Sequence, residues 1–101
     1  MTKVGTILAQ VDGLLNAAYE VVYGHKTWKD VTPLVAIAAE MICEERRGND
    51  CAYWVIFKGD EKDTFEAKNT LESIGLCVCD YYWHDTDEYD TAGGHMSVYW
   101  H

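Results

Sequence analysis

Lysine and arginine are missing from the last third of the chain, residues 69–101. The first 68 residues hold all eight basic residues against eleven acidic ones, so both parts are acidic and the net charge is −9. A surface of this kind repels nucleic acid and anionic membranes and attracts basic proteins. We therefore expect no direct contact with nucleic acid or a membrane, and a basic protein as the partner.

Long apolar runs are also missing, and the chain has a single proline. No run approaches the roughly 20 apolar residues of a membrane-spanning helix, and the N-terminal residues lack the basic-then-apolar pattern of a secretory signal. A hydrophobic content of 49% argues against disorder. We expect one globular domain over residues 1–101, located in the cytoplasm. The sequence leaves the oligomeric state open, and a dimer is compatible with it.

The cysteines are Cys43, Cys51, Cys77 and Cys79. They lie in apolar surroundings, and a chain of 101 residues can build a core without disulfides. We expect reduced thiols in buried, structural positions.

Hydrophobic spacing predicts three helices. Apolar residues recur at helical intervals over Thr6–Tyr23. Thr32–Pro33 supplies an N-cap followed by proline at the first helical position, and this second helix ends at Arg46–Gly48. Asp63 has the spacing of an N-cap for a third, short helix that ends at Gly75.

Three strands complete the predicted fold. Cys51–Lys58 has six apolar residues in a row, which is typical of a strand covered on both faces in the middle of a sheet. Strands over 76–84 and 95–101 follow. A helical crossover would make the first two strands parallel. The third would be antiparallel, either beside the second or on the far side of the first. The prediction is an α+β domain of order ααβαββ, with a three-stranded mixed sheet packed with three helices.

Cysteine and histidine chemistry is the competing interpretation. Cys77 and Cys79 lie two residues apart on one face of a strand, whereas zinc ribbons use a Cys-x-x-Cys spacing. A nucleophilic Cys51 or Cys79 with a histidine base would need positive surroundings, but the charges nearest Cys79 along the chain are acidic. A zinc site would use His84, His95 or His101 together with the cysteine pair, and the base for a nucleophile would be His84 or His95. The alternative is therefore a metal-binding protein or Cys-dependent enzyme, and we assign no catalytic residue, metal or cofactor.

Acidic and aromatic residues alternate along Asp80–Asp90. The acids could chelate a hard cation, but the stretch lacks the glycine and closing glutamate of an EF-hand loop. Aromatic side chains anchor protein interfaces, and acids steer a basic partner onto them. The candidate binding residues are Asp80, Tyr82, Asp85, Asp87, Glu88, Tyr89 and Asp90.

The predicted function is that of a small acidic binding or inhibitor protein. It would contact a basic, nucleic-acid-handling protein through this acidic-aromatic surface. Extended residues two apart are spaced by roughly 6.6 Å, a separation that suits carboxylates imitating phosphates. Small anti-restriction, anti-CRISPR and toxin-immunity proteins act in this manner, and the analogy rests on size and charge alone.

Overall fold

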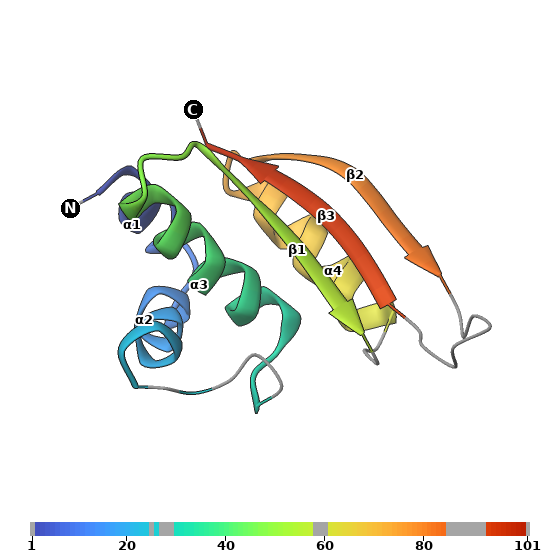
Figure 1. The fold of residues 1–101 in the computed structure, drawn as a ribbon, viewed down its shortest axis with the longest axis horizontal. Coiled ribbons are helices and arrows are strands. Elements are labelled where there is room, and N and C mark those ends of the chain that lie inside the picture. Colours follow the sequence, from blue (N-terminus) through green and yellow to red (C-terminus); the bar gives the residue numbers. More distant parts are fainter. Residues whose placement is uncertain (1, 25, 27–29, 58–60, 85–92, 101) are drawn as a thin grey trace.

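The computed structural model describes residues 2–24, 26, 30–57, 61–84 and 93–100. In these residues four helices accompany a three-stranded sheet, which confirms the α+β class and corrects the predicted three helices (Figure 1). The elements are α1 (Lys3–Leu8), α2 (Leu14–Gly24), α3 (Pro33–Arg46), β1 (Cys51–Phe57), α4 (Glu61–Ser73), β2 (Cys77–His84) and β3 (Gly93–Tyr99).

The first predicted helix is two helices. α1 ends at Leu8 and α2 begins at Leu14, because Gly13 between them adopts a φ of +77° that only glycine takes without strain. The Glu45 carboxylate of α3 accepts a hydrogen bond from the Val4 N–H at 3.0 Å and so ties α1 to α3. The prediction of one continuous helix over Thr6–Tyr23 was therefore wrong.

α3 begins as predicted. The Thr32 hydroxyl accepts a hydrogen bond from the Val35 N–H at 3.4 Å, and Pro33 is the first helical residue. The helix ends before Gly48, which has a φ of +88°. α3 is buried on more than one side, since α2, α4 and β1 all pack against it. Its buried apolar residues are Pro33, Ala36, Ile37, Ala38, Ala39, Met41 and Ile42.

α4 begins at Glu61, two residues before the predicted N-cap, so Asp63 lies in the first helical turn and the predicted cap was wrong. A carboxylate is favourable there because the N-terminal end of a helix is electropositive. The C-terminal end is as predicted. Gly75 has a φ of +96°, and the Leu76 N–H donates to the Leu71 carbonyl at 3.2 Å, closing the helix.

The sheet has the order β1-β3-β2, and both pairings are antiparallel. The predicted mixed sheet with the first strand in its middle was wrong, because β3 lies between the other two. β1 and β2 do run in the same direction, as predicted, but they are not neighbours. The apolar run of β1 is covered on one face only: Trp54 is buried, whereas Tyr53 is 59% exposed.

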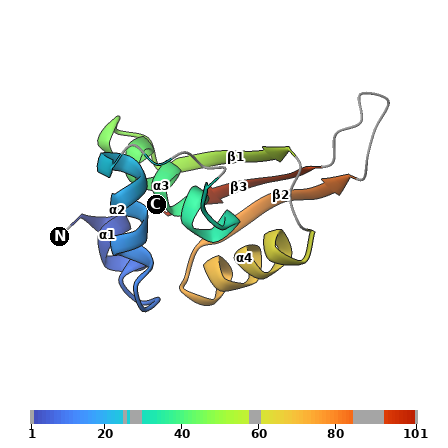
Figure 2. The ribbon, with the colours of Figure 1, turned by 90° about the horizontal axis from the view of Figure 1, so that it is seen from below.

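The core lies between the sheet and the helices, with α4 beneath the sheet and α3 along its β1 side (Figure 2). Its sheet layer consists of Ala52, Trp54, Met96, Val98 and Trp100. None of the helices in the described part of the chain has both the length and the apolar character needed to cross a membrane.

Candidate partner-binding surface

The face of the sheet opposite α3 and α4 is covered by no helix in the described ranges (Figure 2). Strand pairing places three rows of side chains on this open sheet face: Cys51, Tyr99 and Cys77; Tyr53, Ser97 and Cys79; Val55, His95 and Tyr82. With histidine neutral, none of the nine carries a formal charge, although a quarter of the chain is charged. The face is therefore an uncharged surface, rich in aromatic side chains, on an acidic protein.

Three rings form an aromatic row across the open sheet face. The Tyr53 hydroxyl lies 2.7 Å from Nδ1 of His95, and the two ring centroids are 6.1 Å apart. Tyr82 lies on the other side of the imidazole at 6.0 Å. Both tyrosines are 59% exposed. The row thus joins all three strands and presents two large aromatic side chains to solvent.

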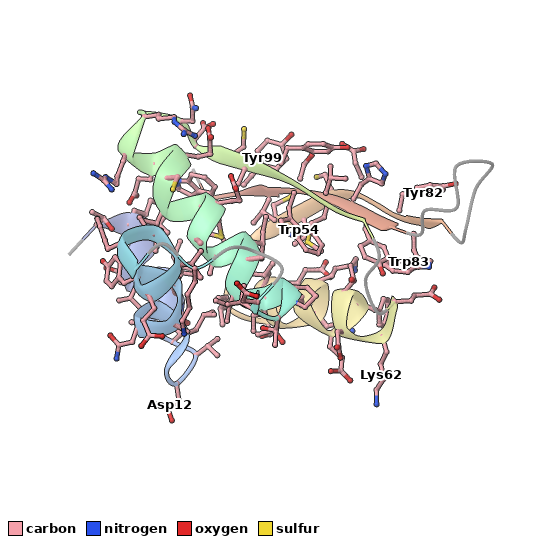
Figure 3. The ribbon with its side chains drawn as sticks, turned by 60° about the horizontal axis from the view of Figure 1, so that its bottom comes forward. Asp12, Trp54, Lys62, Tyr82, Trp83 and Tyr99 are labelled. Carbon is pink, nitrogen blue, oxygen red and sulfur yellow. The ribbon has the colours of Figure 1, made fainter. Side chains whose placement is uncertain are left out.

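A β-bulge at Asp80 decides which aromatics of β2 face outward. Cys79 pairs with Ser97 and Tyr82 pairs with His95, so β2 has one residue more than β3 in this interval. Asp80 takes a φ of +57°, a conformation that aspartate tolerates better than most residues. As a result Tyr82 points away from the helices and Trp83 toward them (Figure 3).

Trp83 packs on the helix side of the sheet. Its partner across the strands is Gly94, where an added Cβ would lie 2.9 Å from Trp83 Cε3 and 2.9 Å from Thr64 Cγ2. The Trp83 ring and the buried Thr64 side chain therefore leave no room for a side chain at position 94 of β3. Trp83 stabilises the fold and does not belong to the open sheet face.

Two of the predicted binding residues fall within the described residues. Asp80 and Tyr82 are both exposed, with Asp80 in the bulge beside the open sheet face and Tyr82 on it. The other five, Asp85, Asp87, Glu88, Tyr89 and Asp90, lie outside the described residues. Sequence reasoning missed Tyr53 and His95. The unbroken apolar run of β1 carries no sequence signal that sets Tyr53 apart from its neighbours.

The cysteines are not the buried residues that the sequence predicted. All four are free, Cys77 is exposed, and the other three are half-buried. Among the described residues no three side chains of cysteine, histidine, aspartate or glutamate gather around a point that could hold a metal ion. The side chain of His84 and all of His101 lie outside the described part of the chain.

The electrostatics around Cys79 do not suit a nucleophile. Its hydrogen bond with Cys77 raises the pKa of the Cys79 thiol, and burial and the nearby Asp80 carboxylate raise it further. A catalytic cysteine needs the opposite, a stabilised thiolate. The structure therefore gives no support to a cysteine nucleophile at this position.

A shallow hollow of about 230 Å³ lies where β1 meets α3. It is lined by Ala36, Glu40, Tyr53, Trp54 and Val55. Glu40 is exposed, so a carboxylate and one ring of the aromatic row share this hollow. Such a pair can receive a cationic side chain, because the ring face and the carboxylate both attract positive charge.

Comparisons with protein-family models, with curated proteins and with solved structures found no match for this chain. Its function is therefore inferred from its own residues.

Proposed function

We propose that this chain is a small acidic binding protein that docks its open sheet face on a basic protein, with a nucleic-acid-handling protein as the target class. The observation that carries the proposal is the aromatic row, in which Tyr53 and Tyr82 are each 59% exposed on an uncharged face of a protein with net charge −9. Binding would inhibit the partner by covering its basic working surface.

The aromatic row supplies the kind of anchor that protein interfaces use. Tyrosine is enriched among the residues that contribute most to binding energy, because it buries a large, rigid ring and keeps a polar group. The His95 contact with Tyr53 limits the freedom of that ring before binding. Less conformational entropy is then lost on association.

Charge selects the class of partner. Six acids and no lysine or arginine follow residue 68, and Asp80 stands beside the open sheet face. Glu40 adds a carboxylate at the hollow next to Tyr53. Exposed acids of this kind accelerate association with a basic surface and weaken association with acidic ones. We also propose that the carboxylates of residues 80–90 imitate the phosphates of a nucleic acid toward the partner.

Affinity capture from a nuclease-treated lysate of the source cells tests the proposal. We expect a basic protein to be retained after nuclease treatment, and salt to weaken its retention, because salt screens attraction between exposed charges. Capture that disappears with nuclease, or that is indifferent to salt, would contradict the proposal.

The variant for this experiment is Tyr53→Ser combined with Tyr82→Ser, and Tyr23→Ser is the matched control. Tyr23 is 57% exposed on α2, away from the sheet, so its loss removes a similar exposed ring from another surface. We expect the double variant to capture at least tenfold less of the basic partner than the wild type does. The Tyr23→Ser control should capture as much as the wild type. Equal capture by all three proteins would place the contact elsewhere.

A further inference from the structure

Cys77 and Cys79 form a thiol pair on the open sheet face. Their sulfur atoms are 3.5 Å apart, because extended residues two apart point to the same side of a strand. Cys77 is exposed and Cys79 is half-buried. Solvent and small ions can therefore reach the pair, and this inference does not depend on the proposed function.

The surroundings of the pair favour binding of a cation over formation of a disulfide. An extended strand separates the two α-carbons by roughly 6.6 Å, near the upper limit for a disulfide, with the β-carbons side by side. Asp80 follows Cys79 directly, and the whole chain is acidic. Negative charge repels anionic oxidants such as glutathione disulfide and attracts positive ions, and a bound metal ion displaces the thiol protons.

The number of ligands narrows the choice of ion. Among the described residues no third metal-ligating side chain joins the pair. Cys51 is on the same face, but Tyr99 pairs between it and Cys77, so two strand spacings of roughly 4.8 Å separate these cysteines. Structural zinc requires four ligands. Soft thiolates select Cu(I), which is stable with only two of them.

We propose that Cys77 and Cys79 bind one Cu(I) ion as a two-coordinate pair of thiolates. Two S–H bonds break, two Cu–S bonds form, two protons go to solvent, and no atom changes its oxidation state. A linear arrangement needs the sulfurs at about twice a metal–sulfur bond of roughly 2.3 Å. Rotation of the exposed Cys77 side chain about its Cα–Cβ bond supplies this separation.

The charge of the proposed complex concerns Lys3, the basic residue that borders the same hollow as Cys77. A Cu(I) ion with two thiolates carries one negative charge. Lys3 and Cys77 line the same hollow of about 390 Å³, together with Tyr99 and Trp100. A lysine that borders the same hollow as Cys77 would favour the anionic complex once the protons have left.

Anaerobic titration of the reduced protein with Cu(I), in competition with the chromogenic chelator bicinchoninate, tests the inference. We expect one Cu(I) per chain. Cys77→Ser and Cys79→Ser should each weaken binding at least tenfold, whereas Cys51→Ser, which removes a thiol from the same face, should bind like the wild type. Circular dichroism of each variant reports whether the fold is kept.

Three results would overturn the site. One is the absence of competition with the chelator by the wild-type protein. Another is retained affinity in the Cys77→Ser, Cys79→Ser double variant, which would mean that Cu(I) binds through Cys43 or Cys51. The third is a stoichiometry of one ion per two chains, because the proposed pair lies within one chain.

Discussion

The Tyr53 hydroxyl on β1 lies 2.7 Å from Nδ1 of His95 on β3, across 42 residues of sequence. Tyr53 pairs directly with Ser97, so this contact is diagonal, between neighbours two positions apart on the adjoining strand. Tyr82 of β2 packs on the same imidazole. One histidine in the central strand therefore orders the exposed tyrosines of both edge strands.

Gly94 is the first position for a stability test. Alanine there would bring its Cβ within 2.9 Å of both Trp83 and Thr64, and overpacking of this kind costs about 1–3 kcal/mol. We expect Gly94→Ala to lower the free energy of unfolding in urea by that amount.

Gly24→Ala is the matched control for Gly94→Ala. Gly24 ends α2, and nothing lies within 4 Å of a Cβ built on it. This control should unfold like the wild type. If both variants were equally stable, Trp83 would not pack over Gly94 as described.

The bulge at Asp80 makes a second prediction. Asparagine tolerates the left-handed region, whereas a β-branched residue does not, and the conformation costs ordinary residues about 1–2 kcal/mol. Thermal unfolding should therefore show Asp80→Asn close to wild type and Asp80→Val clearly less stable. A stable Asp80→Val would mean that β2 can pair with β3 without the bulge, which would turn Tyr82 to the helix side.

Several features of the fold follow from local patterns in the sequence. Thr32 caps α3 and Gly75 closes α4, as their residue types and spacing predict. In β3, Met96 and Val98 are buried and alternate with less buried neighbours, as the period of two predicts. These features depend on residues a few positions apart, and so they can be read along the chain.

Strand order could not be read in this way. The apolar run of β1 looks like a central strand, but its aromatic and β-branched residues also suit an edge strand with one open face. Similarly, Tyr82 was identified from its acidic and aromatic neighbours, whereas Tyr53 and His95 join the candidate surface only through the pairing of β1 with β3. That pairing is non-local and has no signature in either segment alone.

Alkylation of the cysteines gives a third prediction. Cys77 is exposed, whereas Cys79 is half-buried and its pKa is raised by the hydrogen bond with Cys77. A raised pKa means less thiolate at a given pH, and the thiolate is the reacting form. Limiting iodoacetamide should modify Cys77 before Cys79, as resolved by peptide mass spectrometry. The preference should vanish in denaturant, and equal folded-state rates would contradict the exposure and the pKa shift.

The lowered pKa of the Glu44 carboxyl predicts that the free energy of unfolding depends on pH. Hydrogen bonds from Asn49 and Arg47 lower the pKa of this carboxyl below its ordinary value of 4.5. A folded-state pKa below the unfolded one adds stability above the unfolded pKa, and this is lost as the pH falls through the folded pKa. We expect wild type to be more stable than Glu44→Gln at neutral pH and the two to converge in strong acid. A difference that persists in acid would exclude the ionised carboxylate as its cause.

The central claim, that the open sheet face is the docking surface, is tested most directly by photo-crosslinking. A benzophenone amino acid replaces Tyr53 in one protein and the similarly exposed Tyr23 of α2 in another, and each is irradiated with the captured basic partner. We predict a crosslink from position 53 that high salt reduces, and none from position 23. Crosslinking from position 23 with none from position 53 would contradict the account and move the contact to the helical side.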